Sequence, residues 1–121
     1  MPKKALIVDD SVTIRQMLSF TLRGAQFEVL EAEHGQDALD KLKDVAPDLI
    51  VTDLNMPVMD GIEFIRRARS LSQTRYVPIL MLTTESQPEK KAAGKAAGAT
   101  GWIVKPFQPT NFLAVISKLV V

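Results

Sequence analysis

Five short apolar runs, each rich in β-branched residues, alternate with segments of helical periodicity along this 121-residue chain. The runs predict five strands, which lie at residues 5–8, 27–31, 49–52, 77–82 and 101–104. Strict alternation of strand and helix favours right-handed crossovers, which make the strands parallel and put helices on both faces of the sheet. Five such units are too few for an eight-stranded barrel, so the sequence predicts an open, doubly wound α/β sheet.

Apolar residues at helical spacing predict the helices between these strands, each with one buried stripe. The stripes are Ile14, Met17, Leu18 and Leu22; Leu39 and Leu42, running into Val45; Phe64, Ile65, Ala68 and Leu71; and Phe112, Val115, Ile116 and Leu119. Ser11 is placed to cap the first helix and Thr110 the last. The fourth helix has only a stripe of alanines around Gly94, which indicates either a weakly anchored helix or a close approach to the sheet.

Composition excludes several classes of protein. The chain is 46% hydrophobic but has no apolar run long enough to cross a bilayer, which predicts one soluble domain over residues 1–121. It has no cysteine and no signal-peptide pattern, which is typical of a cytoplasmic protein without disulfides or thiolate metal sites. The net charge of +1 provides no overall attraction to nucleic acid or to an anionic membrane. The single histidine, His34, lacks a metal-ligand partner at useful spacing, so we predict a surface position for it.

Three of the apolar runs stop at charged residues. The first run stops at Asp9 and Asp10, the third at Asp53 and the fifth at Lys105. Parallel strands present their carboxyl ends on one edge of the sheet, so the three carboxylates and the lysine are predicted to share one cleft. Crowded carboxylates stay ionised only beside a cation, which predicts a hard metal ion such as Mg²⁺.

Two further residues extend this predicted site. The backbone carbonyl of Asn55 can complete a metal shell, and the hydroxyl of Thr83, at the end of the fourth run, can donate to a phosphoryl oxygen. Each of these residues taken alone is also typical of a helix cap, a loop or a strand end. The combination is more specific, and it indicates a carboxylate that handles phosphate beside a metal ion.

Several motifs, in order and at these separations, resemble the receiver domains of two-component response regulators. The matching segments lie at residues 6–11, 52–57, 60–61, 82–83, 98–99 and 102–107, so the resemblance covers essentially the whole chain. It is closest to the stand-alone chemotaxis type, the CheY-like receivers. The resemblance implies a (βα)5 flavodoxin-like, doubly wound parallel sheet with strand order 2-1-3-4-5, an order taken from the known folds of flavodoxin and CheY.

The resemblance also implies a role for each acidic residue. Asp53 corresponds to the phosphoacceptor, which takes a phosphoryl group from a phosphohistidine of a histidine kinase. Asp9 and Asp10 correspond to the acidic pair that holds Mg²⁺ together with Asp53 and the backbone carbonyl of Asn55. Mn²⁺ is expected to substitute for Mg²⁺ at such a site.

The remaining site residues follow from the same resemblance. Thr83 corresponds to the switch hydroxyl, and Lys105 to the cation that contacts the phosphoryl group. The resemblance further implies a cis peptide bond between Lys105 and Pro106.

Other positions set the lifetime and the output of the phosphorylated state in this family. Asn55 and Glu85 each lie two residues after a site residue, and the family tunes the hydrolysis of its acyl phosphate there. Trp102 stands where the family usually has tyrosine or phenylalanine, so it is a switch residue whose larger ring makes coupling to Thr83 an open question. Thr84 stands where the family favours a very small residue, which narrows access to Asp53.

The implied function is a single-domain response regulator rather than an enzyme, with self-catalysed phosphorylation and autodephosphorylation, most directly in chemotaxis. Its expected partners are a CheA-like histidine kinase, a phosphatase, and a target such as a flagellar motor switch protein. We expect a monomer that contacts no nucleic acid and inserts into no membrane. The alternatives are a phosphate sink or phosphorelay receiver outside chemotaxis, a small aspartate-nucleophile phosphatase, a flavin carrier, or an adaptor that binds without phosphorylation.

Overall fold

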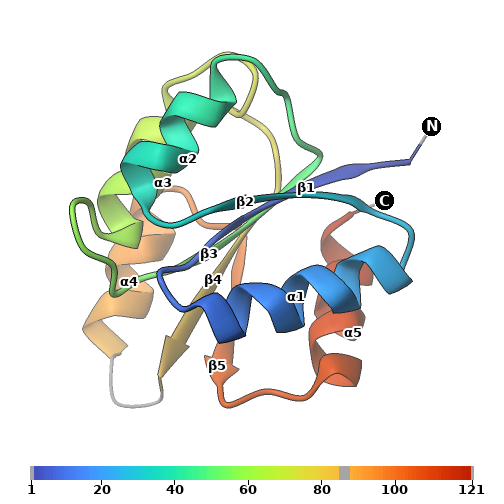
Figure 1. The fold of residues 1–121 in the computed structure, drawn as a ribbon. Coiled ribbons are helices and arrows are strands. Elements are labelled where there is room, and N and C mark those ends of the chain that lie inside the picture. The colour runs from blue at the N-terminus through green and yellow to red at the C-terminus, as the bar shows by residue number, and fades with distance from the viewer. Residues whose placement is uncertain (1, 85–87, 121) are drawn as a thin grey trace.

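The computed structural model describes residues 2–84 and 88–120, and these form five parallel strands alternating with five helices (Figure 1). The strands are β1 (Lys4–Val8), β2 (Glu28–Ala32), β3 (Leu49–Asp53), β4 (Ile79–Thr84) and β5 (Gly101–Lys105). The helices are α1 (Val12–Gly24), α2 (Gly35–Leu42), α3 (Gly61–Arg69), α4 (Pro88–Ala97) and α5 (Pro109–Leu119). The strand order is β2-β1-β3-β4-β5 with every neighbouring pair parallel, which confirms the predicted α/β class and order.

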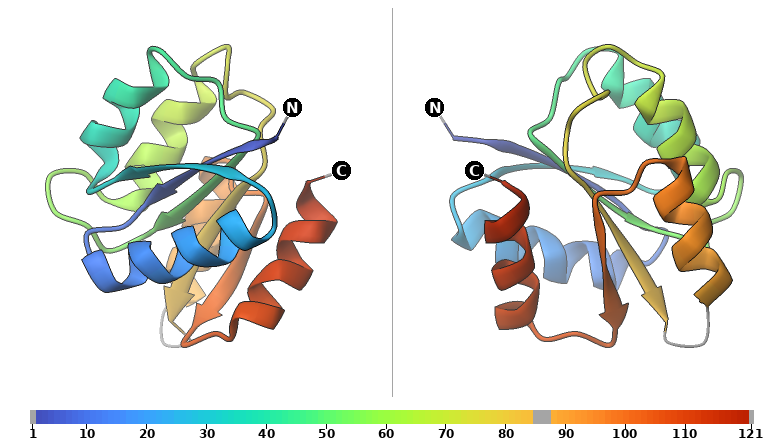
Figure 2. Two further views of the ribbon diagram at one scale, coloured as in Figure 1. Left: turned by 45° about the vertical axis from the view of Figure 1, so that its right-hand side comes forward. Right: turned by 180° about the vertical axis from the view of Figure 1, so that it is seen from behind.

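Helices cover both faces of the sheet (Figure 2). Successive side chains of a strand point to opposite faces, so each buried strand supplies two layers of core. On one face Ile7 of β1 packs in a cluster with Leu18 of α1 and Phe112 of α5. On the other face Leu6 packs in a cluster with Phe64 of α3, beneath α2 and α3. β3 is buried along its whole length, which explains why its sequence is almost continuously apolar up to its last two residues.

The prediction of a helix cap was correct for Ser11 and wrong for Thr110. The Ser11 hydroxyl accepts a hydrogen bond of 3.2 Å from the backbone N–H of Ile14 and so caps α1. In contrast, α5 already begins at Pro109, and Gln108 occupies its N-cap position without a side-chain hydrogen bond. Proline suits the first turn of a helix because its fixed φ is helical and its missing N–H is not needed there. Thr110 therefore lies inside the helix.

The start of α2 corrects the prediction for His34. This histidine is half-buried rather than a free surface residue, and its Nδ1 accepts a hydrogen bond of 3.2 Å from the backbone N–H of Asp37. His34 is thus the N-cap of α2. The helix ends at Leu42, so Val45 lies beyond it, in the loop that leads to β3.

The contact of α4 with the sheet depends on Gly94. Ala92, Ala93 and Ala96 of the predicted alanine stripe are exposed, whereas Gly94 is buried. A Cβ atom at residue 94 would lie 2.0 Å from the Met81 sulfur, so a larger residue there would displace the Met81 side chain. The close approach is therefore made at Gly94 and not by the alanine stripe, while a weakly anchored helix stays a prediction.

None of the helices within residues 2–84 and 88–120 combines the length and the apolar character that a membrane span requires.

Candidate functional site

The register of the sheet brings the first two acidic strand ends together. β1 pairs with β3 so that Val8 lies beside Thr52, and Asp9 and Asp53 follow at the next level on neighbouring strands. Both aspartates are buried, with 0% and 7% of their surface exposed. The prediction that distant carboxylates meet at one edge of the sheet is therefore correct.

β4 and β5 add two more of the predicted residues to the same edge. Asp53 pairs with Leu82, so Thr83 lies one position further along β4, where it is buried. Lys105 ends β5, and its peptide bond to Pro106 is cis, as predicted.

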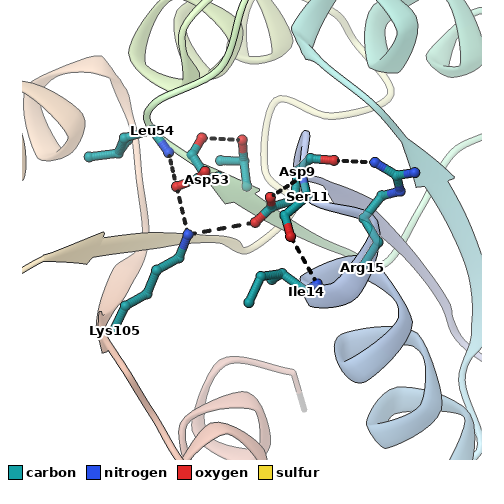
Figure 3. A network of polar contacts seen from close by, with 8 residues as sticks. Asp9, Ser11, Ile14, Arg15, Asp53, Leu54 and Lys105 are labelled. Carbon is teal, nitrogen blue, oxygen red and sulfur yellow. Dashed lines mark hydrogen bonds and ion pairs between the residues drawn. The ribbon is translucent and has the colours of Figure 1, made fainter.

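Lys105 reaches across to both buried carboxylates (Figure 3). Its Nζ lies 3.1 Å from Asp53 Oδ1 and 3.7 Å from Asp9 Oδ2. With 24% of its side chain exposed, Lys105 closes one side of the site while its amine stays among the carboxylates. A lysine amine is a compact charge, which suits it to contact an anionic oxygen from several directions.

Asp9 carries a polar atom that the protein leaves without a hydrogen bond. Its Oδ1 accepts a hydrogen bond of 2.9 Å from the backbone N–H of Ser11. Its buried Oδ2 accepts no hydrogen bond from residues 2–84 and 88–120, and the contact with Lys105 at 3.7 Å is too long to be one. Burial raises the pKa of the Asp9 carboxyl and the Asp53 carboxylate raises it further, whereas the Ser11 N–H and Lys105 lower it.

Asp53 is fixed by its own neighbour and by the start of α3. Asp53 Oδ1 accepts a hydrogen bond of 2.8 Å from the backbone N–H of Leu54. Gly61, the first residue of α3, donates its N–H to the Leu54 carbonyl at 2.9 Å. A Cβ atom at residue 61 would lie 2.1 Å from the Asp53 carbonyl oxygen, so only glycine allows the helix to begin against this strand end.

Three carboxylates of this edge are placed to share one cation. Asp9, Asp10 and Asp53 each offer an oxygen, and these three oxygens lie within 4.8 Å of one another. Asp10 is exposed while the other two are buried, so the group opens to solvent on one side only. Carboxylate oxygens are the ligands that hard divalent cations prefer, and Mg²⁺ keeps several waters on its open side. The partnerless Asp9 Oδ2 fits such an ion.

The remaining predicted residues lie around this group with different exposure. Asn55 is exposed in the loop after β3. Trp102 on β5 keeps 41% of its surface exposed, so its ring is not enclosed in the core. Glu85 and the side chain of Thr84 lie outside the described part of the structure.

Arg15 belongs to the surroundings of the site and was missed from the sequence. Its Nη1 donates a hydrogen bond of 2.6 Å to the backbone carbonyl of Asp9 (Figure 3). Its Nε lies 3.4 Å from Glu31 Oε1. The available signal was an arginine in the helix that directly follows the acidic pair. The close contact of Gly61 with Asp53 was also not predicted, because it depends on how α3 packs.

The chain matches the response regulator receiver domain family over residues 5–117. It is 43% identical over 108 residues to the chemotaxis protein CheY1 of Helicobacter pylori, covering 88% of this chain and 87% of that protein. It is 36% identical over 119 residues to the phosphate regulon transcriptional regulatory protein PhoB of Escherichia coli, covering 98% of this chain. The chain spans only about half of PhoB, 52% of its length.

A solved structure agrees with these sequence matches. The chemotaxis response regulator CheY4 of Vibrio cholerae superimposes with a TM-score of 0.94 and is 51% identical, covering 99% of this chain and 100% of that one. The sheet order, the acidic strand ends and the family match lead to one conclusion. The chain belongs to the response regulator receiver domains of two-component signalling and has the CheY-like fold.

Proposed function

We propose that this receiver domain accepts a phosphoryl group on Asp53 from a histidine kinase, in a reaction that needs Mg²⁺. The observation that supports the proposal most strongly is the convergence of Asp9, Asp10 and Asp53 with the Lys105 amine. A bound Mg²⁺ supplies positive charge that draws electrons from the transferring phosphoryl group. Asp9, Asp10, Asp53 and the Asn55 carbonyl are the groups that would hold it.

The hydrogen bonds of Asp53 indicate which oxygen attacks phosphorus. Oδ1 accepts from the Leu54 N–H and contacts Lys105, so Oδ2 is the nucleophile. The bond from Oδ2 to phosphorus forms while the bond from phosphorus to the histidine nitrogen breaks. The imidazole leaves with the electron pair and takes up a proton. Such transfers need mainly positioning and neutralisation of charge, which the fixed carboxylate and Lys105 provide.

Phosphorylation adds negative charge and acceptor oxygens to this edge of the sheet. The Thr83 hydroxyl, one position beyond Asp53 on the neighbouring strand, is placed to move toward the new oxygens. Its movement alters the surface around Trp102 on the neighbouring strand β5. Asn55 and Glu85 act on the lifetime of the acyl phosphate. The domain then signals through protein binding that depends on phosphorylation.

The relatives favour chemotaxis as the pathway. The similarity to CheY1 and CheY4 extends over almost the full length of both proteins. The partners we propose are therefore a CheA-like histidine kinase, a phosphatase and a flagellar motor switch target, with residues 1–121 acting as one receiver domain.

Incubation with acetyl phosphate followed by intact-mass analysis tests this proposal. Wild-type protein is expected to gain the mass of one phosphoryl group with Mg²⁺ or Mn²⁺ and to gain none with a chelator. Asp53→Asn should gain none, whereas Asp44→Asn, which changes an exposed aspartate away from the site, should behave as wild type. Phosphorylation of Asp53→Asn to the wild-type extent, or no phosphorylation of the wild type, would overturn the proposal.

A further inference from the structure

Both main-chain polar groups of Asp9 are hydrogen-bonded, the N–H to β2 and the carbonyl to Arg15 of α1. Its N–H donates a hydrogen bond of 3.1 Å to the carbonyl of Ala32, the last residue of β2. Its carbonyl accepts the 2.6 Å hydrogen bond from Arg15. Figure 3 shows Arg15 on the far side of Asp9 from Lys105, so this arginine contacts the backbone and not the carboxylate.

Arg15 in turn depends on Glu31. The two side chains form an ion pair with a separation of 3.4 Å, and only 12% of the Arg15 side chain is exposed. Glu31 directly precedes Ala32, so both links from Asp9 end on neighbouring residues of β2. The planar guanidinium has donors in a fixed arrangement, which lets one side chain hold a carbonyl and a carboxylate at once.

This arrangement determines where the Asp9 carboxylate lies. A carboxylate that shares a metal ion must keep its oxygen within about 0.2 Å of the metal–ligand distance. The Asp9 side chain has a single hydrogen bond, from Ser11, so its position also depends on how firmly the backbone is held. Glu31 has a second effect, because its charge offsets that of Arg15 close to a site for a divalent cation.

We infer that Arg15, held by Glu31, is a positioning residue that sets the affinity of the site for Mg²⁺ through the backbone of Asp9. The inference rests on the proposed function, since it concerns the metal site of that reaction. It assigns no contact with substrate or metal to Arg15. Loss of Arg15 should therefore weaken metal binding without changing the phosphorylation rate once the metal saturates the site.

Calorimetric titration with Mg²⁺ tests the inference directly. Arg15→Met keeps much of the apolar stem and is expected to lower Mg²⁺ affinity about tenfold, the scale observed for residues that orient metal ligands. Glu31→Gln should lower it less, about threefold, because the hydrogen-bonding amide remains while the charge is lost. In the double variant the two losses should not add, since Glu31 acts through Arg15.

The phosphorylation rate at increasing Mg²⁺ provides a second measurement that a purely structural role would not reproduce. Arg15→Met should need about ten times more Mg²⁺ for half of the maximal rate and still reach that rate within about twofold. Arg15→Lys, which keeps one donor and the charge, should recover part of the affinity. Arg23→Met, an exposed arginine on the same helix, is the matched control and should leave both measurements unchanged.

The outcomes separate the two proposals. Equal Mg²⁺ affinity in folded Arg15→Met and wild type would overturn the inference and leave the proposed function standing. A wild-type protein that neither binds Mg²⁺ nor becomes phosphorylated would overturn both. If Arg15→Met fails to fold, Arg15→Lys provides the test. Its Mg²⁺ affinity should fall about threefold, and an unchanged Mg²⁺ affinity would overturn the inference.

Discussion

At the amino ends of β4 and β5, Arg69 donates hydrogen bonds to the carbonyls of Thr74, Val77 and Gly98, at 2.8, 2.6 and 2.9 Å. At the carboxyl ends of β1 and β3, by contrast, the buried Asp9 Oδ2 accepts no hydrogen bond within the part of the chain that the structure describes. The half-buried Arg69 guanidinium donates from all three of its nitrogens. The buried Asp9 carboxylate has one hydrogen bond from Ser11 and an ion pair with Lys105, but its Oδ2 accepts no hydrogen bond from the described residues.

This difference separates a stabilising site from a binding site. A satisfied buried charge holds its neighbours in one arrangement, whereas an unsatisfied one costs free energy until a ligand arrives. Arg69 joins the end of α3 to the loops before β4 and β5. The acidic edge, formed by Asp9, Asp10 and Asp53, holds negative charge that a bound cation would neutralise.

The largest expected effect is at the satisfied end. Arg69→Met should lower the free energy of unfolding by about 3 kcal/mol, because several half-buried carbonyls lose their donor. Urea unfolding measures the loss, and Arg75→Met, an exposed arginine nearby, should stay within about 0.5 kcal/mol of wild type. If Arg69→Met is as stable as this control, Arg69 is not a structural link and the comparison fails.

The next effect concerns space at the acidic edge. Gly61→Ala should lower the free energy of unfolding by about 2 kcal/mol, since its Cβ has no room beside the Asp53 carbonyl. It should also slow phosphorylation by acetyl phosphate, because the Asp53 backbone must move. Gly24→Ala is a matched control, since a Cβ there meets no atom within 4 Å, and it should be neutral or stabilising by up to about 1 kcal/mol.

A smaller effect has the opposite sign. Asp9→Asn should raise the free energy of unfolding without metal by about 1 kcal/mol at neutral pH, because the cost of burying this carboxylate, whose Oδ2 accepts no hydrogen bond from the described residues, exceeds the gain from its ion pair with Lys105. Chemical denaturation in the presence of a chelator measures this gain. A variant less stable than wild type under these conditions would mean that the Asp9 carboxylate stabilises the fold.

The smallest effect is a pH dependence carried by Asp9. Burial and the Asp53 carboxylate raise the pKa of Asp9 above its ordinary 3.8, so between these values the folded protein binds more protons than the unfolded chain. The contribution of Asp9 to the free energy of unfolding therefore falls as pH rises from about 4 through the raised pKa, and then levels off.

Other acids act in the opposite direction. Lys41 donates a hydrogen bond to Asp37 and lowers the pKa of that carboxyl, for example, so its contribution to stability grows as pH rises. The quantity to measure is therefore the difference between wild type and Asp9→Asn without metal. The advantage of the variant should grow from about pH 4 toward neutral pH. A difference that is the same at all pH values would contradict the raised pKa of Asp9.

The acidic edge was predictable because it follows from two facts that a sequence contains. Apolar runs reveal where strands stop, and strict alternation with helices makes the strands parallel. Asp9, Asp53 and Lys105 then meet once the strand order is known, and that order came from the resemblance to CheY-like receivers and not from periodicity. The positions of all three depend on the ends of strands and not on details of packing.

The remaining features depend on contacts between elements that periodicity does not encode. The hydrogen bond from Arg15 to Asp9 depends on the direction in which the Arg15 side chain leaves its helix, which the sequence does not show. The close contact of Gly94 with Met81 follows only from how α4 packs on β4. Helix α5 begins at Pro109, one residue before Thr110. The fixed φ of proline suits the first turn of a helix, so Thr110 lies inside α5 and does not cap it.

The most direct test of the account is the free energy of unfolding of wild type and Asp9→Asn, each measured with a chelator and with Mg²⁺. At about 100 times its dissociation constant, Mg²⁺ should stabilise wild type by about 2.7 kcal/mol, because it binds the folded state. Asp9→Asn should be the more stable protein without metal and should gain almost nothing from Mg²⁺. A wild type that Mg²⁺ does not stabilise, or a variant that gains as much, would contradict the claim that this edge is kept unsatisfied for a cation.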